Sequence, residues 1–166
     1  MRKAIVFAIL LFLGLFFTAR SSCSNKDMLP YLGKWPGGFV VSEVRRGPNT
    51  SVDQKRSSLK GFVQIYATNH KFKLHLEGEQ ETIDVDGDWT RKAKRMDLRV
   101  QHVVIDDQGG AALRDPNRKF ILPDDIRAAY SRPLILDLSA DGKNLNGLPM
   151  SIGDLTGRHL FAKETY

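Results

Sequence analysis

The feature that most constrains the fold of this chain is an alternation of apolar and polar residues with a period of two. Phe72, Leu74 and Leu76 show it clearly, as do Leu136 and Leu138, and the pattern recurs along most of the chain after residue 37. A period of two places successive side chains on opposite faces and is typical of strands with one buried face. The sequence therefore predicts an all-β protein.

Turn-forming residues divide this pattern into about eight segments, and one further segment resembles a short helix. The predicted helix over 123–130 begins with Pro123, Asp124 and Asp125, and acidic residues suit a helix N-terminus. We expect an antiparallel eight-stranded barrel or sandwich over residues 33–166, with this one short helix. The expected strands span 38–44, 61–66, 72–76, 82–90, 95–105, 120–122 (the weakest), 133–139 and 155–163.

The first 22 residues have the pattern of a signal peptide. Arg2 and Lys3 precede an apolar run over 4–17, and small polar residues follow it. The run is shorter than the ~20 residues that a membrane-spanning helix needs. We therefore expect residues 1–22 to direct export and to be removed.

Cys23 is the single cysteine of the chain and follows this run directly. The junction Ser21-Ser22-Cys23-Ser24 resembles the lipobox of bacterial lipoproteins, in particular those of Bacteroidota. That resemblance implies a diacylglycerol on the sulfur of Cys23, a tether over 23–32, and a place in the cell envelope, anchored to the outer membrane on its periplasmic or surface face. Arg20 departs from the lipobox, so a cut before Ser22 that yields a secreted protein is the alternative. A lone cysteine favours lipidation, since it cannot form an internal disulfide.

The formal charge of +6 gives little reason to expect a nucleic-acid partner. Arg2, Lys3 and Arg20 lie in the signal peptide, and the rest of the chain has 22 basic and 19 acidic residues. The densest basic cluster, over 91–95, lies between two expected strands and lacks the interleaved aromatic residues that stack on bases. We expect a solvated hairpin tip there, with contact to anionic lipid or polysaccharide as the alternative.

Gly33-Lys34-Trp35 resembles the Gly-x-Trp motif of lipocalins and other calycin-type barrels. Gly87-Asp88-Trp89, the strand-turn-strand over 138–145 and the last strand over 159–163 fit the same order, which resembles the small lipocalin-like lipoproteins of Bacteroidota. The resemblance covers residues 33–163. It implies that Gly33 and Trp35 pack at one end of a barrel.

The predicted function is non-catalytic binding of a small apolar or amphipathic ligand in the barrel mouth. His102 shares the parity of Leu98 and Val100, so we expect it to point inward. The alternative is a protein-interaction module, such as an envelope-assembly subunit or a hydrolase inhibitor, with a barrel filled by its own side chains and contacts from loops 45–58 and 106–132. The candidate cavity residues are Trp89, Met96, Leu98, Val100, His102, Leu136 and Leu138.

No motif in the sequence supports catalysis, a metal site or a cofactor. The four histidines show no ligand spacing, and the sequence has no nucleophile elbow or phosphate-binding loop. Asp84, Asp86 and Asp88 alternate along an expected strand and should share its solvent face. We therefore expect no catalytic residue, no metal and no cofactor, and a membrane, a small apolar ligand or an envelope protein as partners.

Overall fold

The computed structural model describes residues 28–44, 58–78, 81–107 and 122–164. The predicted signal peptide, the predicted lipidation site Cys23 and most of the expected strand at 120–122 lie outside these residues. So do most of loops 45–58 and 106–132. None of the helices within the described ranges has the length and hydropathy to span a membrane.

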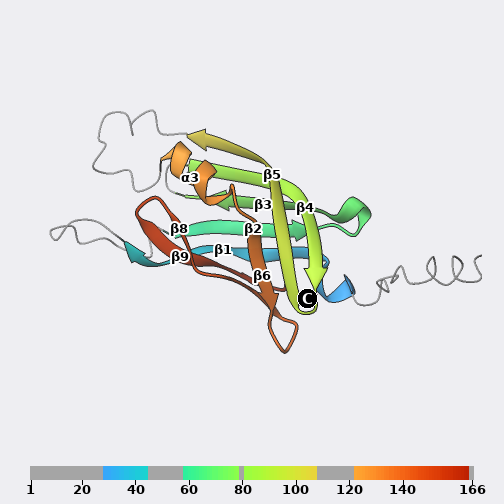
Figure 1. The fold of residues 1–166 in the computed structure, drawn as a ribbon. Coiled ribbons are helices and arrows are strands. Elements are labelled where there is room, and N and C mark those ends of the chain that lie inside the picture. The colour runs from blue at the N-terminus through green and yellow to red at the C-terminus, as the bar shows by residue number, and fades with distance from the viewer. Residues whose placement is uncertain (1–27, 45–57, 79–80, 108–121, 165–166) are drawn as a thin grey trace, which may run out of the picture. The chain divides into compact units, whose positions relative to one another are not determined.

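The described residues form an antiparallel β-barrel (Figure 1). Strands β1 to β7 follow each other around the sheet in chain order, and β9 closes it by pairing with both β7 and β1. This closure confirms the predicted all-β class and decides for the barrel over the sandwich. The strands are β1 (Gly33–Val44), β2 (Leu59–Ile65), β3 (Lys71–Glu77), β4 (Glu81–Lys92), β5 (Arg95–Asp107), β6 (Leu134–Leu138), β7 (Asn144–Gly147), β8 (Met150–Ile152) and β9 (Leu155–Ala162).

Nine strands make eight positions in the barrel wall, because β7 and β8 share one. The first half of β9 pairs with β8 and its last residues pair with β7. The interruption falls at Leu148 and Pro149, where the backbone N–H of Leu148 still donates to the carbonyl of Ile135 at 3.2 Å. A proline has no N–H to donate to a neighbouring strand, which suits it to such a break.

Two turns explain how the wall folds back on itself. The predicted hairpin of β2 and β3 is confirmed, and Asn69 in the turn η2 (Thr68–His70) has a φ of 58°. Asparagine tolerates this left-handed conformation better than most residues. The basic segment 91–95 is the predicted tip, since β4 ends at Lys92 and β5 begins at Arg95.

The predicted short helix is also confirmed. It is α3 (Pro123–Ala129), and the side-chain oxygen Oδ2 of Asp125 accepts a hydrogen bond from the backbone N–H of Leu122 at 3.1 Å. That bond satisfies one of the donors that a helix N-terminus leaves free. Ile126 is its buried residue, and α3 packs beside β8.

The core fills the barrel with side chains from alternate wall positions. Trp35, near the start of β1, is a wholly buried member of this core. Its indole Nε1 donates to the carbonyl of Tyr31 in η1 (Leu29–Tyr31) at 2.9 Å. The strand starts at Gly33, five residues before the apolar alternation begins, and its register with β2 runs without a break through Pro36. Other wholly buried core residues are Phe39, Val63, Phe72, Leu74, Leu76, Ile83, Trp89, Met96, Leu98, Leu136 and Leu145.

A β-bulge interrupts the longest pairing, between β4 and β5. Asp86 faces His102 and Gly87 faces Val100, so Gln101 is the extra residue on β5. Glycine is required at position 87, because a Cβ atom there would collide with the backbone carbonyl of Arg99. The bulge reverses the parity of β5 beyond residue 100.

We predict that Gly87→Ala destabilises the protein by about 1–3 kcal/mol, since backbone must move to accept the new methyl group. Urea denaturation followed by circular dichroism measures the free energy of unfolding. Thr90→Val on the same strand is the control, because Thr90 is exposed and the change should stay within about 0.5 kcal/mol. Equal stability of Gly87→Ala and the wild type would show that the bulge does not need a glycine.

Candidate binding site

Four of the predicted cavity residues are packed inside the barrel. Met96, Leu98 and Leu136 have no exposed surface, and Trp89 is 1% exposed. A side chain that bordered a water-sized space would expose surface to it, so Met96, Leu98 and Leu136 border none, and Trp89 is almost wholly packed. The other two apolar candidates, Val100 and Leu138, are half-buried.

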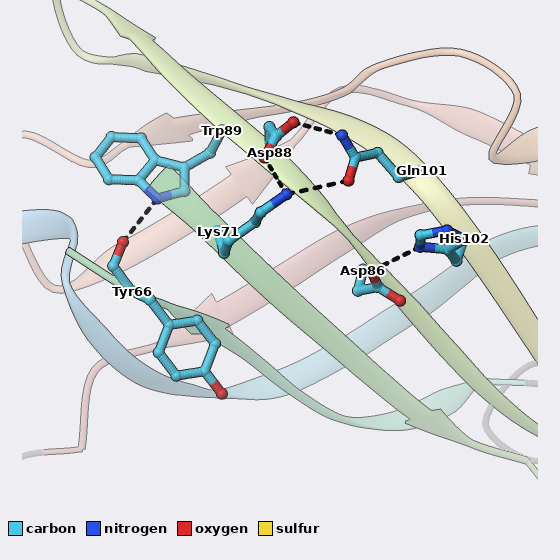
Figure 2. Close-up of polar contacts among 7 residues, drawn as sticks. All are labelled: Tyr66, Lys71, Asp86, Asp88, Trp89, Gln101 and His102. Carbon is cyan, nitrogen blue, oxygen red and sulfur yellow. Dashed lines mark hydrogen bonds and ion pairs between the residues drawn. The ribbon is translucent and has the colours of Figure 1, made fainter. Parts of the chain in front are cut away.

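Trp89 closes the interior at the end of the barrel near η2. Its indole Nε1 donates to the carbonyl of Tyr66 at 3.0 Å (Figure 2). The ring of His70 lies over it, with 5.0 Å between ring centroids. Trp89 and Trp35 are both wholly packed in the core.

The predicted inward orientation of His102 is wrong. Its side chain is 71% exposed, and its Nδ1 lies 3.0 Å from a carboxylate oxygen of Asp86 on the outer surface (Figure 2). The cause is the bulge at Gln101, which turns every later side chain of β5 to the opposite face. His102 is therefore not an interior residue and cannot line a cavity inside the barrel.

The histidine inside the barrel is His159 on β9. It has no exposed surface, and its Nε2 shares a hydrogen bond of 3.2 Å with the hydroxyl of Tyr130. The rings of Phe39 and Phe161 flank it, at 5.3 and 5.8 Å between centroids. The sequence could have predicted this burial, because Leu155, His159 and Phe161 are odd-numbered positions of one strand and therefore lie on the same face.

Burial sets the protonation of this pair. Removal of the His159 imidazole from water lowers its pKa to about 3, against 6.5 for an ordinary histidine. Burial also raises the pKa of the Tyr130 hydroxyl. Both groups are thus neutral at physiological pH, and Nδ1 of His159 is a buried nitrogen without a hydrogen-bond partner among the described residues.

Tyr130, the partner of His159, also lines a groove on the outside of the barrel. The groove has a volume of about 830 Å³ and lies between α3, the segment 130–135 and the segment 148–153. Ala128, Leu148 and Met150 contribute apolar surface, and Leu148 is 41% exposed. Volumes of ~300–1,000 Å³ are usual for small-molecule sites.

The groove also has a cation at its rim. Arg132 lines it and is exposed, and it forms no ion pair among the residues described. Asp125, the acidic residue of the lining, accepts the helix-capping hydrogen bond of Leu122. An apolar groove with an available guanidinium suits a molecule with an apolar body and an acidic head.

The outer face of β3, β4 and β5 is a ladder of ion pairs, as Figure 2 shows in part. Lys71 lies 2.7 Å from Asp88, and His75 lies 3.0 Å from Asp84, so the prediction that these aspartates share the solvent face with Asp86 is confirmed. Hydrogen bonds to Glu77 and then Asp84 raise the pKa of His75. Among the described residues no group of three His, Cys, Asp or Glu side chains is arranged to hold a metal ion.

We predict that His159 makes the protein less stable as the pH falls from about 6.5 toward 3. The unfolded chain binds a proton in this range and the folded chain does not, so stability declines by up to about 1.4 kcal/mol per pH unit. Urea denaturation at several pH values measures this slope. The double variant His159→Phe with Tyr130→Phe should lose that part of the slope.

Tyr130→Phe alone is the matched control. It removes the same hydrogen bond, but keeps the titrating imidazole, so it should keep the pH dependence. Identical slopes for the wild type and the double variant would contradict the assignment.

Comparison of the chain with protein-family models, with curated proteins and with solved structures finds no match. The resemblance to lipocalin-like lipoproteins therefore stays a prediction from the motifs.

Proposed function

We propose that this protein is a cell-envelope lipoprotein whose barrel is a non-catalytic binding domain for a small amphipathic molecule with an acidic head. The ligand occupies the groove beside α3 and not the interior near Trp89. The groove itself is the observation that supports the proposal. It combines exposed apolar side chains with the exposed Arg132, whereas the interior candidates Met96, Leu98 and Leu136 have no exposed surface to offer a ligand.

The chemistry of the groove favours binding over catalysis. Tyr130 is its titratable core-facing group, and burial keeps its hydroxyl protonated. Its partner His159 is buried and neutral, so neither group is poised to move a proton near pH 7. The proposed role of the pair is to hold the segment after α3 against the barrel wall and thereby shape the groove.

A protein-interaction module, such as an envelope-assembly subunit or a hydrolase inhibitor, is the second candidate. The packed interior around Met96, Leu98 and Leu136 favours it, because a filled barrel serves a partner that binds outside. Exposed Leu148 and Leu122 near α3 offer apolar contact surface to such a partner.

We predict that decanoate, as a probe with an apolar body and a carboxylate, binds the groove. Ala128→Trp should abolish the binding, because the indole fills the groove from the exposed face of α3. Arg132→Ala should weaken it about tenfold or more, since a charge-assisted hydrogen bond contributes about 1.5–3 kcal/mol. Isothermal titration calorimetry measures both effects.

Ala162→Trp is the control, because Ala162 is exposed at the end of β9 and does not line the groove. Equal decanoate affinity in Ala128→Trp and Ala162→Trp would contradict the groove as the site. If decanoate does not bind, but Ala128→Trp loses a protein that copurifies from the native host, the interaction module becomes the better explanation.

The lipid anchor has its own test. We predict that the wild-type protein carries diacylglycerol on Cys23 and fractionates with membranes, and that Cys23→Ala is released in soluble form without the added mass. Intact mass spectrometry of both proteins from the native host measures this. Soluble release of both proteins after a cut before Ser22 would show secretion instead.

A further inference from the structure

We propose that one end of the barrel is a docking surface for a bilayer that contains anionic lipids. This entry end is defined as residues 31–34, 66–71, 92–95, 138–144 and 163–164. This docking proposal goes beyond the proposed function, because it assigns a membrane contact to side chains of the barrel itself. Figure 1 shows the start of β1, the β4–β5 hairpin and the C-terminus at this end.

The basic hairpin tip is fixed to the point where the chain enters the barrel. The hydroxyl of buried Tyr31 donates to the carbonyl of Ala93 at 3.2 Å. The guanidinium carbon of Arg91 lies 5.6 Å from the centre of the Tyr31 ring. Residues 92–95 therefore project beside the first residue of the barrel unit, Tyr31.

The entry end has a large excess of positive charge. It contains seven basic and two acidic residues, an excess of five. Neighbouring strands offset two of these charges, because Asp88 pairs with Lys71 at 2.7 Å and Asp137 pairs with Arg95 at 3.1 Å. The basic residues are Lys34, Lys71, Lys92, Lys94, Arg95, Lys143 and Lys163, and the acidic ones are Asp141 and Glu164.

Lys92 and Lys94 are the strongest candidates for membrane contact. Both are exposed, and their ammonium groups pair with no carboxylate in the part of the chain that the structure describes. The loop between β6 and β7 adds Lys143 at this end. The acidic residue of that loop, Asp141, accepts hydrogen bonds from the Ser139 hydroxyl and from the backbone N–H of Lys143. A lysine close to an anionic bilayer contributes about 1 kcal/mol of binding energy, which its neighbours reinforce.

The length of the chain before the barrel makes a bilayer the fitting partner. Seven residues lie between Cys23 and Tyr31, and the eight steps along the chain span at most about 28 Å when fully extended. The lipid anchor that the proposed function places on Cys23 would keep the entry end within this distance of the membrane surface. A lipid chain and a basic patch together anchor a protein more firmly than one chain alone.

The test uses the chain from residue 24, which lacks the lipid but keeps the whole barrel, because the barrel closes on itself within residues 33–162. Sedimentation with vesicles of equimolar phosphatidylglycerol and phosphatidylcholine measures the partition coefficient. We expect binding to these vesicles at low salt and little binding to phosphatidylcholine alone. Lys92→Glu with Lys94→Glu should lower the partition coefficient at least about tenfold.

Lys60→Glu with Arg158→Glu is the matched control, because it makes the same change in net charge on exposed positions of β2 and β9 away from the entry end. Equal loss in both double variants would overturn the proposal, since net charge and not the entry end would then govern binding. So would binding to dextran sulfate but not to the anionic vesicles, which would identify an anionic polysaccharide as the partner. Circular dichroism of each variant checks its fold.

The outcome is independent of the decanoate and Cys23 experiments. Loss of lipidation in the native host leaves the vesicle result unchanged, because the assay uses a chain without lipid. A failure of decanoate binding concerns the groove beside α3, in which no residue of the entry end takes part.

Discussion

The structure depends on β9 being paired along both edges. Its backbone bonds to β1 on one side and to β7 and β8 on the other, and this converts a meandering sheet into a closed barrel. Closure removes the free strand edges that an open sheet would expose there. It also encloses His159, which lies on β9 between Phe39 and Phe161.

The closed wall leaves different chemistry inside and outside. Large buried side chains, among them Trp35 and Trp89, pack the interior and stabilise the fold. The break at Leu148 and Pro149 and the helix α3 create the groove outside the wall. Binding is therefore proposed where the regular barrel is interrupted.

Most of the fold could be predicted because most of its elements have a local cause in the sequence. Period-two alternation predicted the positions of β3 and β6, and the acidic residues Asp124 and Asp125 indicated the start of α3. The basic segment 91–95 was recognisable as a tip from the strands on either side. The alternation did not predict β7 and β8, because segments of four and three residues are too short to show a periodicity.

The candidate site was much harder to predict, since it depends on contacts between distant residues. By itself the sequence determined the strand class, the helix and the basic tip, because these follow from neighbouring residues along the chain. The tertiary structure alone decided that His102 faces solvent, through a bulge of one residue at Gln101. It also brought Tyr130 to His159, 29 positions apart, since the sheet closes through hydrogen bonds between strands that no local pattern encodes.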